Sequence, residues 1–189
     1  MSADPRPPMA QITDDSLMAQ IQRSDQRAFR DLFARHYNAA LRYAFLLCGN
    51  REDARDLIQE AFVRVYRGAV QYKMQGRFRG WLFTIVRNLA ADRVKRRTVK
   101  TTGSPAALSA AAKAPAPPVR EGGSSFLAQL AGLSEEQREI IVLRVVEEMT
   151  YAEIASITGL REENLRQIVS RGLTKLREKG ASNELQPAE

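Results

Sequence analysis

The chain has 189 residues, 44% of them hydrophobic, and a formal net charge of +7. That length allows one moderate hydrophobic core or two small ones, and the excess of basic residues favours a polyanionic partner. Cysteine and histidine occur once each, as Cys48 and His36, which is too few for a Cys/His metal cluster. Cys48 follows an apolar run typical of the core, so a Cys/His catalytic pair is not expected either. We therefore expect no metal site and no enzymatic activity.

The N-terminal segment MSADPRPPMAQ lacks the charged and apolar regions of a signal peptide. No uninterrupted apolar run approaches the ~18 residues of a membrane span. These features predict a cytoplasmic protein without membrane insertion. Residues 1–12 and 181–189 are expected to be disordered.

Apolar residues recur at helical spacing and nowhere at a sustained spacing of two, which predicts an all-α protein. The first helix should run from about Asp14 to Arg23. A longer second helix follows Ser24 and should end at Gly49, and Asn50 then caps a third helix.

The third predicted helix has one apolar face and one polar face. Its buried stripe should comprise Leu57, Ile58, Ala61, Phe62 and Val65. On the other side, acids and arginines follow each other at three- and four-residue steps. Acids early in a helix are favoured by its dipole, and Glu60 can pair with Arg64, so an ordinary solvated face also explains this pattern.

Residues 71–97 hold eight basic residues against the single acid Asp92, a difference equal to the whole net charge of +7. Four aromatic residues are interleaved with these cations: Tyr72, Phe78, Trp81 and Phe83. Cations can hold a phosphate backbone while aromatic rings stack unpaired bases. This segment therefore predicts nucleic-acid binding.

Within that segment, a polar and flexible link over 71–76 should lead into a fourth helix from about Arg77. One stripe of this helix is expected to face the core, namely Phe78, Leu82, Ile85 and Leu89. Beside it lies a stripe of Trp81, Thr84, Asn88 and Lys95. These side chains offer stacking and hydrogen bonds to bases and phosphates, although Trp81 also fits a large core residue at the domain edge.

Residues 98–122 are rich in Ala, Pro and Gly and predict a flexible linker, whose prolines favour extended conformations. The two sides of this linker differ in charge. Residues 13–97 carry 17 Lys and Arg against 9 Asp and Glu, a net charge of +8, whereas residues 123–180 carry 8 against 9, a net charge of −1. This asymmetry favours two domains.

The segment after the linker shows two helix-start signatures, Ser134 with Gln137 and Thr150 with Glu153, which both fit a capping box. After the second come a small residue, Gly159 to reverse the chain, and an apolar anchor in the final helix, which should end near Lys179. This order is typical of a helix-turn-helix. An ordinary helical hairpin is the alternative.

On both sides of the linker, these residues resemble bacterial sigma factors of the extracytoplasmic-function (ECF) type. In the first half, AFRDLFARHYNAALRYAFLLCGNREDARDLIQEAFVRVYR and FRGWLFTIVRNLAADRVKRR are similar to sigma region 2. In the second half, LSEEQREIIVLRVVEEMTYAEIASITGLREENLRQIVSRGLTKLRE is similar to region 4. The resemblance implies a four-helix region 2 domain over 13–97 and a region 4 helix-turn-helix domain over 123–180.

The resemblance also implies a function that needs no cofactor. Sigma factors of this type bind core RNA polymerase and direct it to promoters. Region 2 recognises and melts the minus-ten element, and region 4 binds the minus-thirty-five element. The implied partners are core RNA polymerase, promoter DNA and an anti-sigma factor, the last implied by the family and not by any residue.

By the same resemblance, residues can be assigned to each partner. The positions implied to bind polymerase are Asp53, Asp56, Gln59, Glu60 and Phe62. Those implied to bind DNA in the first half are Tyr72, Lys73, Arg77, Arg79, Trp81, Arg87, Asn88, Arg93, Lys95, Arg96 and Arg97. In the second half the helix from Arg161 should enter the major groove with Asn164, Arg166, Gln167, Ser170, Arg171 and Lys175.

The chain departs from the family pattern in this last helix. Family members commonly carry Thr at the position of Asn164 and additional Arg at those of Ile168 and Leu173. Two other classes of protein therefore stay open. A stand-alone helix-turn-helix regulator would leave the first half unused, and a sigma-like adaptor would account for a weakened recognition helix.

Overall fold

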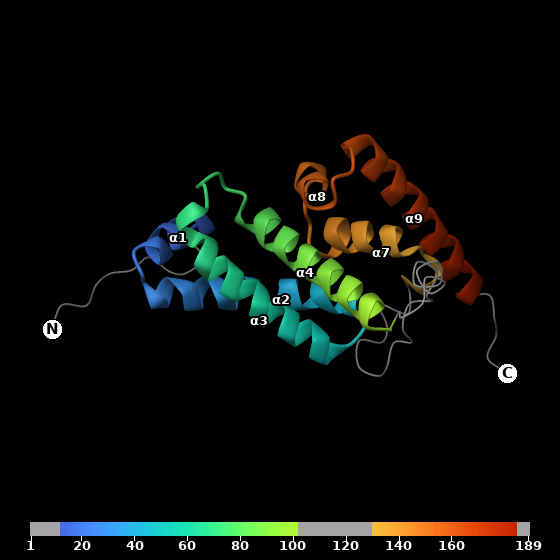
Figure 1. Ribbon diagram of the computed structural model, residues 1–189. Coiled ribbons are helices and arrows are strands. Elements are labelled where there is room, and N and C mark those ends of the chain that lie inside the picture. The colour runs from blue at the N-terminus through green and yellow to red at the C-terminus, as the bar shows by residue number, and fades with distance from the viewer. Residues whose placement is uncertain (1–11, 102–129, 185–189) are drawn as a thin grey trace.

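The computed structural model describes residues 12–101 and 130–184, and within these ranges all regular structure is helical. The predicted all-α class is confirmed. The α-helices are α1 (Asp14–Gln22), α2 (Gln26–Cys48), α3 (Arg51–Gly68), α4 (Phe78–Thr101), α7 (Glu135–Ile141), α8 (Tyr151–Thr158) and α9 (Glu162–Glu184) (Figure 1). Short 3-10 turns, η2 (Ala69–Gln71) and η4 (Leu130–Gly132), and a π-helical turn, η5 (Val142–Val146), complete the described elements.

The helices of the first half begin and end where their capping residues predict. The side chains of Thr13, Asp25 and Asn50 accept hydrogen bonds from the first-turn amides of α1, α2 and α3. Gly49 ends α2 with φ 74°, a left-handed conformation that glycine adopts without steric cost. Two boundaries differ from the prediction, because α4 continues to Thr101 and α9 to Glu184.

The first domain packs α2, α3 and α4 around a common core, with α1 against α2. All five residues predicted for the apolar face of α3 are buried: Leu57, Ile58, Ala61, Phe62 and Val65. Phe62 makes edge contacts with Phe29 and lies 4.6 Å from the ring of Phe33. Burial of this face accounts for the stability of the helix.

The second domain contains the predicted helix-turn-helix. Both capping boxes are confirmed, with Ser134 and Gln137 at the start of α7 and Thr150 and Glu153 at the start of α8. Gly159 ends α8 at φ 77°. Helix α9 then packs on α7 and α8. This packing is close at Gly172, where a Cβ atom would lie 2.4 Å from Cδ1 of Ile141.

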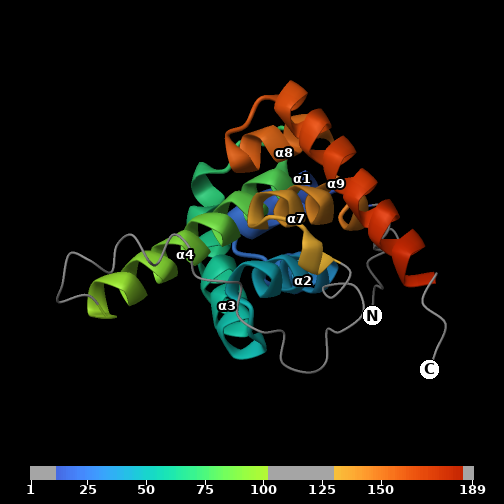
Figure 2. The ribbon, with the colours of Figure 1, turned by 90° about the vertical axis from the view of Figure 1, so that its right-hand side faces the viewer.

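Helix α4 is the element of the first domain that faces the second domain, with α2 and α3 on one side of it and α7 and α8 on the other (Figures 1 and 2). Its last turns project away from the body of the molecule (Figure 2). One cluster of buried apolar residues includes members of both domains, such as Leu82 and Ile154. The domains are therefore joined by a continuous core.

This position of α4 corrects two predictions about its faces. Phe83, expected among the base-stacking aromatics, is fully buried and stacks on Tyr43 with ring centroids 5.0 Å apart. Ile85, expected in the core, is half-buried, whereas Val86 is buried. Periodicity predicted a single buried stripe, but the helix packs against elements on two sides and therefore buries a wider surface.

Candidate nucleic-acid and polymerase interfaces

The aromatic residues of the predicted DNA-binding segment form a cluster where η2 leads into α4. The rings of Tyr72 and Trp81 lie 5.0 Å apart, and Phe78 lies 6.0 Å from each of them. Phe78 is buried, so it supports the cluster from below, while Tyr72 and Trp81 are half-buried. A Cβ atom on Gly68 would lie 3.2 Å from the Trp81 ring, so the absence of a side chain there lets the indole pack on α3.

The predicted cations around this cluster fall into two groups. The exposed ones are Lys73, Arg77, Lys95 and Arg96, together with the amide of Asn88. Lys95 and Arg96 belong to the last turns of α4, which project away from the body of the molecule (Figure 2). The side chain of Arg97 lies outside the described residues.

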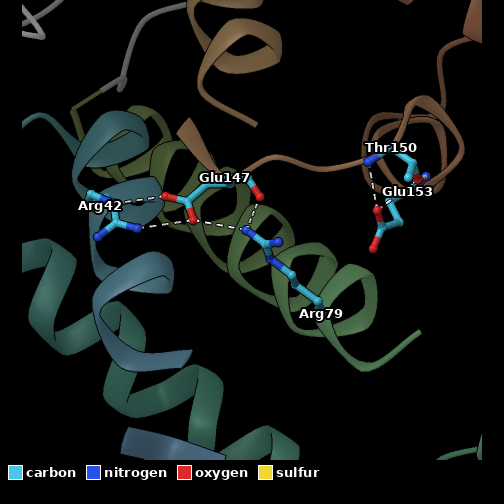
Figure 3. A network of polar contacts seen from close by, with 5 residues as sticks. All are labelled: Arg42, Arg79, Glu147, Thr150 and Glu153. Carbon is cyan, nitrogen blue, oxygen red and sulfur yellow. Dashed lines mark hydrogen bonds and ion pairs between the residues drawn. The ribbon is translucent and has the colours of Figure 1, made fainter. Parts of the chain in front are cut away.

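Arg79 and Arg87 form the second group, because carboxylates of the second domain already hold them. Arg79 donates from Nη2 to Oε2 of Glu147 at 3.2 Å and to the backbone carbonyl of the same residue (Figure 3). Arg42 of α2 donates to the same carboxylate from Nε at 2.9 Å and from Nη2 at 3.2 Å. Glu147 is 2% exposed, so its charge depends on these two arginines for compensation.

Glu139 of α7 forms a second polar contact between the domains. Its Oε1 accepts hydrogen bonds from the Tyr43 hydroxyl at 2.6 Å and from Nε of Arg87 at 2.8 Å. Burial, followed by the charge and hydrogen bond of Glu139, raises the pKa of Tyr43 well above its usual value, so the phenol stays protonated and donates. A carboxylate thus occupies the guanidinium of Arg87, a residue predicted to bind DNA.

Local backbone geometry positions Glu147 for its contacts with Arg42 and Arg79. The π-helical turn η5 ends at Glu147, whose N–H donates to the carbonyl of Val142 at 3.0 Å. Glu148 then adopts φ 52°, which reverses the chain before the capping box of α8 begins at Thr150 (Figure 3).

The predicted polymerase-binding face of α3 is only partly available. Asp56 and Gln59 are exposed, and Glu60 pairs with Arg64 at 2.9 Å. Arg93 of α4, assigned above to DNA, instead donates to the carbonyl of Asp53 at 3.0 Å and lies 3.9 Å from Glu60. The assignment of Phe62 to this face is wrong, because its ring is buried in the core between α2 and α3.

The outer face of α9 presents all the polar residues predicted for it: Asn164, Arg166, Gln167, Ser170, Arg171 and Lys175 are exposed. Arg166 donates to Glu162 at 2.9 Å, and its guanidinium lies 5.1 Å from the centre of the Tyr151 ring. Leu165 and Val169 face inward. Leu173 is 38% exposed, which leaves it on the outer side. The helix therefore has an exposed polar face, as expected for a recognition helix.

Three carboxylates that contact distant parts of the chain were not predicted: Asp15, Glu139 and Glu147. Each contacts residues far away in the chain, so helical periodicity carries no signal for them. A weak signal exists for Glu147, since it follows a run of apolar residues and is nevertheless charged. Within the described residues, no group of His, Cys, Asp and Glu could hold a metal ion, and no helix is long and apolar enough to cross a membrane.

Two sequence families match the chain, one in each domain. Sigma-70 region 2 matches residues 32–99, which include most of α2 and all of α3. Sigma-70, region 4 matches residues 124–176, which include the helix-turn-helix. The matches thus follow the two domains in order.

Curated relatives extend over both domains. The RNA polymerase sigma factor CarQ of Myxococcus xanthus is 34% identical over 170 residues, which cover 86% of this chain and 95% of CarQ. The ECF RNA polymerase sigma factor SigE of Mycolicibacterium smegmatis is 33% identical over 165 residues. That match covers 84% of this chain but 64% of SigE, so the chain spans less than two thirds of this relative.

Solved structures share the fold. CnrH, in complex with the cytosolic domain of CnrY, superposes with a TM-score of 0.66 at 27% identity and covers 89% of this chain and 97% of CnrH. The sigma factor RpoE of Bartonella quintana, in complex with the anti-sigma factor NepR, has a TM-score of 0.63 at 23% identity, which shows a common fold. That match covers 79% of this chain and 94% of the RpoE chain.

A cationic, aromatic helical domain joined to a helix-turn-helix domain defines a class of two-domain transcription proteins. Within that class, the matches in both domains and the 34% identity to CarQ place the chain in a single family. The chain belongs to the ECF family of RNA polymerase sigma factors.

Proposed function

We propose that this protein binds core RNA polymerase and directs it to specific promoters. One observation carries the proposal: a single chain joins a region 2 domain to a region 4 domain whose recognition helix α9 has an exposed polar face. A stand-alone helix-turn-helix regulator would need only the second of these domains. The protein acts in the cytoplasm, without a cofactor and without enzymatic activity of its own.

The two domains divide the promoter between them. Region 2 captures the melted minus-ten element with the exposed faces of Tyr72 and Trp81, and the cations of α4 hold the flanking phosphates. Region 4 places α9 in the major groove of the minus-thirty-five element. The exposed acids and amides of α3, above all Asp56 and Gln59, bind the polymerase.

The two domains must separate for this function. Arg79 and Arg87 belong to the region 2 surface for DNA, but Glu147 and Glu139 of region 4 occupy them. A carboxylate and a phosphate compete for the same guanidinium donors. The arrangement in Figures 1 and 3 is therefore a closed form that binds promoter DNA poorly.

We further propose that an anti-sigma factor binds this chain. Two considerations support it. The family to which the chain belongs is regulated in this way, and the similar protein CnrH was solved bound to the cytosolic domain of CnrY. Such a partner would only need to stabilise the closed form, because that form already covers part of the DNA-binding surface.

Run-off transcription with purified core polymerase tests the proposed function. The full chain should support initiation from promoters that carry the minus-ten and minus-thirty-five elements it recognises, and core enzyme alone should not. A sigma-like adaptor would bind the polymerase without stimulating initiation. A stand-alone regulator would bind duplex DNA without the polymerase, and either result would replace the proposed function.

A further inference from the structure

The loop between η2 and α4, residues 72–77, is bound on both sides by one carboxylate of α1. Oδ1 of Asp15 accepts a hydrogen bond from the Tyr72 hydroxyl at 2.8 Å, and Oδ2 accepts one from the backbone N–H of Gly76 at 2.7 Å. Gln22, at the other end of α1, donates from Nε2 to the carbonyl of Ala69 at 2.8 Å. The sequence predicted a flexible link here, but these contacts give the loop a defined shape.

The two contacts of Asp15 lie at the two ends of the loop, so one carboxylate holds both ends together. Gly76 has φ 66°, a conformation that residues with side chains rarely adopt, and its N–H points at the carboxylate. Burial, followed by the hydrogen bond and charge of Asp15, raises the pKa of Tyr72, so the phenol remains a donor across the ordinary pH range.

Helix α1, which carries Asp15, is firmly anchored in the first domain. Leu17, Met18 and Ile21 bury α1 against the first domain. The neighbouring Asp14 accepts from Nη1 of Arg35 at 2.7 Å and lies 2.9 Å from Nε2 of His36, which ties the first turn of α1 to α2. A positioning group acts well only when its own support is fixed in this way. Helix α1 lies before residue 32, where the region 2 match begins.

The contact with Asp15 determines where the Tyr72 ring lies relative to Trp81. The hydroxyl of Tyr72 is held by Asp15, and its ring lies 5.0 Å from that of Trp81. In the proposed function these two rings stack bases of the melted strand. A change in loop shape would therefore change the surface that a base meets, without removing any group that contacts it.

We propose that Asp15 is a positioning residue for minus-ten recognition: by binding Tyr72 and Gly76 at once, its carboxylate shapes the loop 72–77 and thereby sets how strictly region 2 discriminates the melted bases. This inference rests on the proposed function of region 2. It assigns a role to α1, which would otherwise only stabilise the fold.

The test uses two variants on adjacent residues of α1. Asp15→Asn keeps the shape of the side chain but leaves one acceptor oxygen for two donors. Asp14→Asn is the matched control, because it removes one polar contact of α1 with α2 while the buried Leu17, Met18 and Ile21 keep the helix in place and the loop contacts stay intact. Trp81 is the single tryptophan of the chain, so its fluorescence reports the loop directly in the full-length protein.

We expect Asp15→Asn to increase acrylamide quenching of Trp81, with Asp14→Asn close to wild type. In holoenzyme with core polymerase, Asp15→Asn should lower the preference for the cognate minus-ten element over single-base variants by about fivefold to tenfold, the equivalent of one ordinary hydrogen bond. Preference at the minus-thirty-five element should stay unchanged, which a merely structural role would not predict.

Two results would overturn the inference. One is an unchanged quenching and discrimination profile in Asp15→Asn. The other is an equal loss in both variants in proportion to their lowered melting temperatures. Wild-type holoenzyme that ignores the minus-ten sequence would instead refute the proposed function of region 2, and the fluorescence comparison would still decide whether Asp15 shapes the loop.

Discussion

Asp14 shows at the scale of a single residue how a polar contact couples stability to pH. Burial by itself would raise the pKa of this carboxyl, but the hydrogen bonds and charges of His36 and Arg35 outweigh it, so the pKa lies below the ordinary value of 3.8. The folded chain therefore favours the ionised form. Its contribution to stability is complete above the unfolded pKa and is lost as the pH falls through the folded pKa.

Replacing Asp14 by Asn should remove this dependence. At about pH 6 the variant should be less stable than wild type by about 1 kcal/mol, a modest value because the side chain is partly exposed. At a pH below the lowered pKa of Asp14 the two proteins should converge, since the wild-type carboxyl is then protonated. Urea unfolding followed by circular dichroism at both pH values measures this, and an equal difference at the two would contradict it.

Among single residues, the sequence best predicted the roles of those that act on their own helix. The caps at Asn50, Ser134 and Thr150 follow from hydrogen bonds to nearby amides and were predicted correctly. It was least reliable for residues that a distant element covers. Phe83 was assigned to a base-stacking surface although it packs on α2, because no local pattern distinguishes a buried aromatic ring from an exposed one. Periodicity placed Phe62 in the core correctly, and only the resemblance assigned it to the polymerase-binding face.

At the scale of the element, α3 combines a buried apolar face with an exposed face that bears Asp56 and Gln59. Charge reversal in Asp56→Arg should reduce the affinity for core polymerase by tenfold or more, on the order of one desolvated charge contact. The fold should change in stability by no more than about 0.5 kcal/mol, because the position is exposed. Co-purification of the variant with core enzyme measures the loss.

The control for that variant is Arg55→Glu, an exposed charge reversal at the preceding position that faces the groove between α2 and α3. It should bind the polymerase like wild type. If both variants assemble normally, the polar face of α3 is only solvated, which was the alternative that the sequence left open.

Helix α9 makes a separate prediction, because its two arginines differ in position and support. The first residues of a recognition helix meet base edges, whereas later ones meet the backbone. Arg166, held by Glu162 and Tyr151, should therefore read a base, and Arg166→Ala should lose about 1–3 kcal/mol of discrimination at one position of the upstream element. Arg171→Ala should weaken all upstream sequences alike and reduce the salt slope by about one.

Transcription from promoters mutated base by base in the upstream element separates these outcomes. The two variants serve as each other's control, since both remove an exposed arginine from the same helix. Identical profiles for them would show that α9 does not enter the groove as proposed. Indifference of the wild-type protein to the upstream sequence would favour the sigma-like adaptor.

At the scale of the whole molecule, the two domains and their order could be predicted, but their arrangement could not. The helices of each domain follow from local caps and from periodic burial, which a sequence displays directly. The contact between domains depends on Glu147 and Glu139 meeting Arg42, Arg79 and Arg87, residues that lie many positions earlier in the chain. From the sequence, the net charge of −1 in the second domain therefore indicated only a separate domain, whereas two of its acids also pair with arginines of the first domain.

This contact between the domains gives the last prediction. Removing both carboxylate charges, in Glu139→Gln with Glu147→Gln, leaves three arginines without their acidic partners and should open the closed form. Because Arg42 is 54% exposed and solvent screens the contact, we expect a destabilisation of the closed form by about 1–3 kcal/mol in total. Opening frees Arg79 and Arg87, so the affinity for single-stranded promoter DNA should rise.

Small-angle X-ray scattering of the free protein measures the opening as a larger radius of gyration, and fluorescence anisotropy with labelled single-stranded DNA measures the affinity. Glu148→Gln is the matched control, because Glu148 is exposed and adjacent to Glu147, and its removal changes the net charge without touching the contact. The affinity gained by the double variant should exceed that of the control and should shrink with added salt, as expected for phosphate contacts on freed guanidinium groups. A double variant that stays as compact as wild type and binds DNA no better than Glu148→Gln would show that the apolar packing of α4 on α8 holds the domains together without the carboxylates.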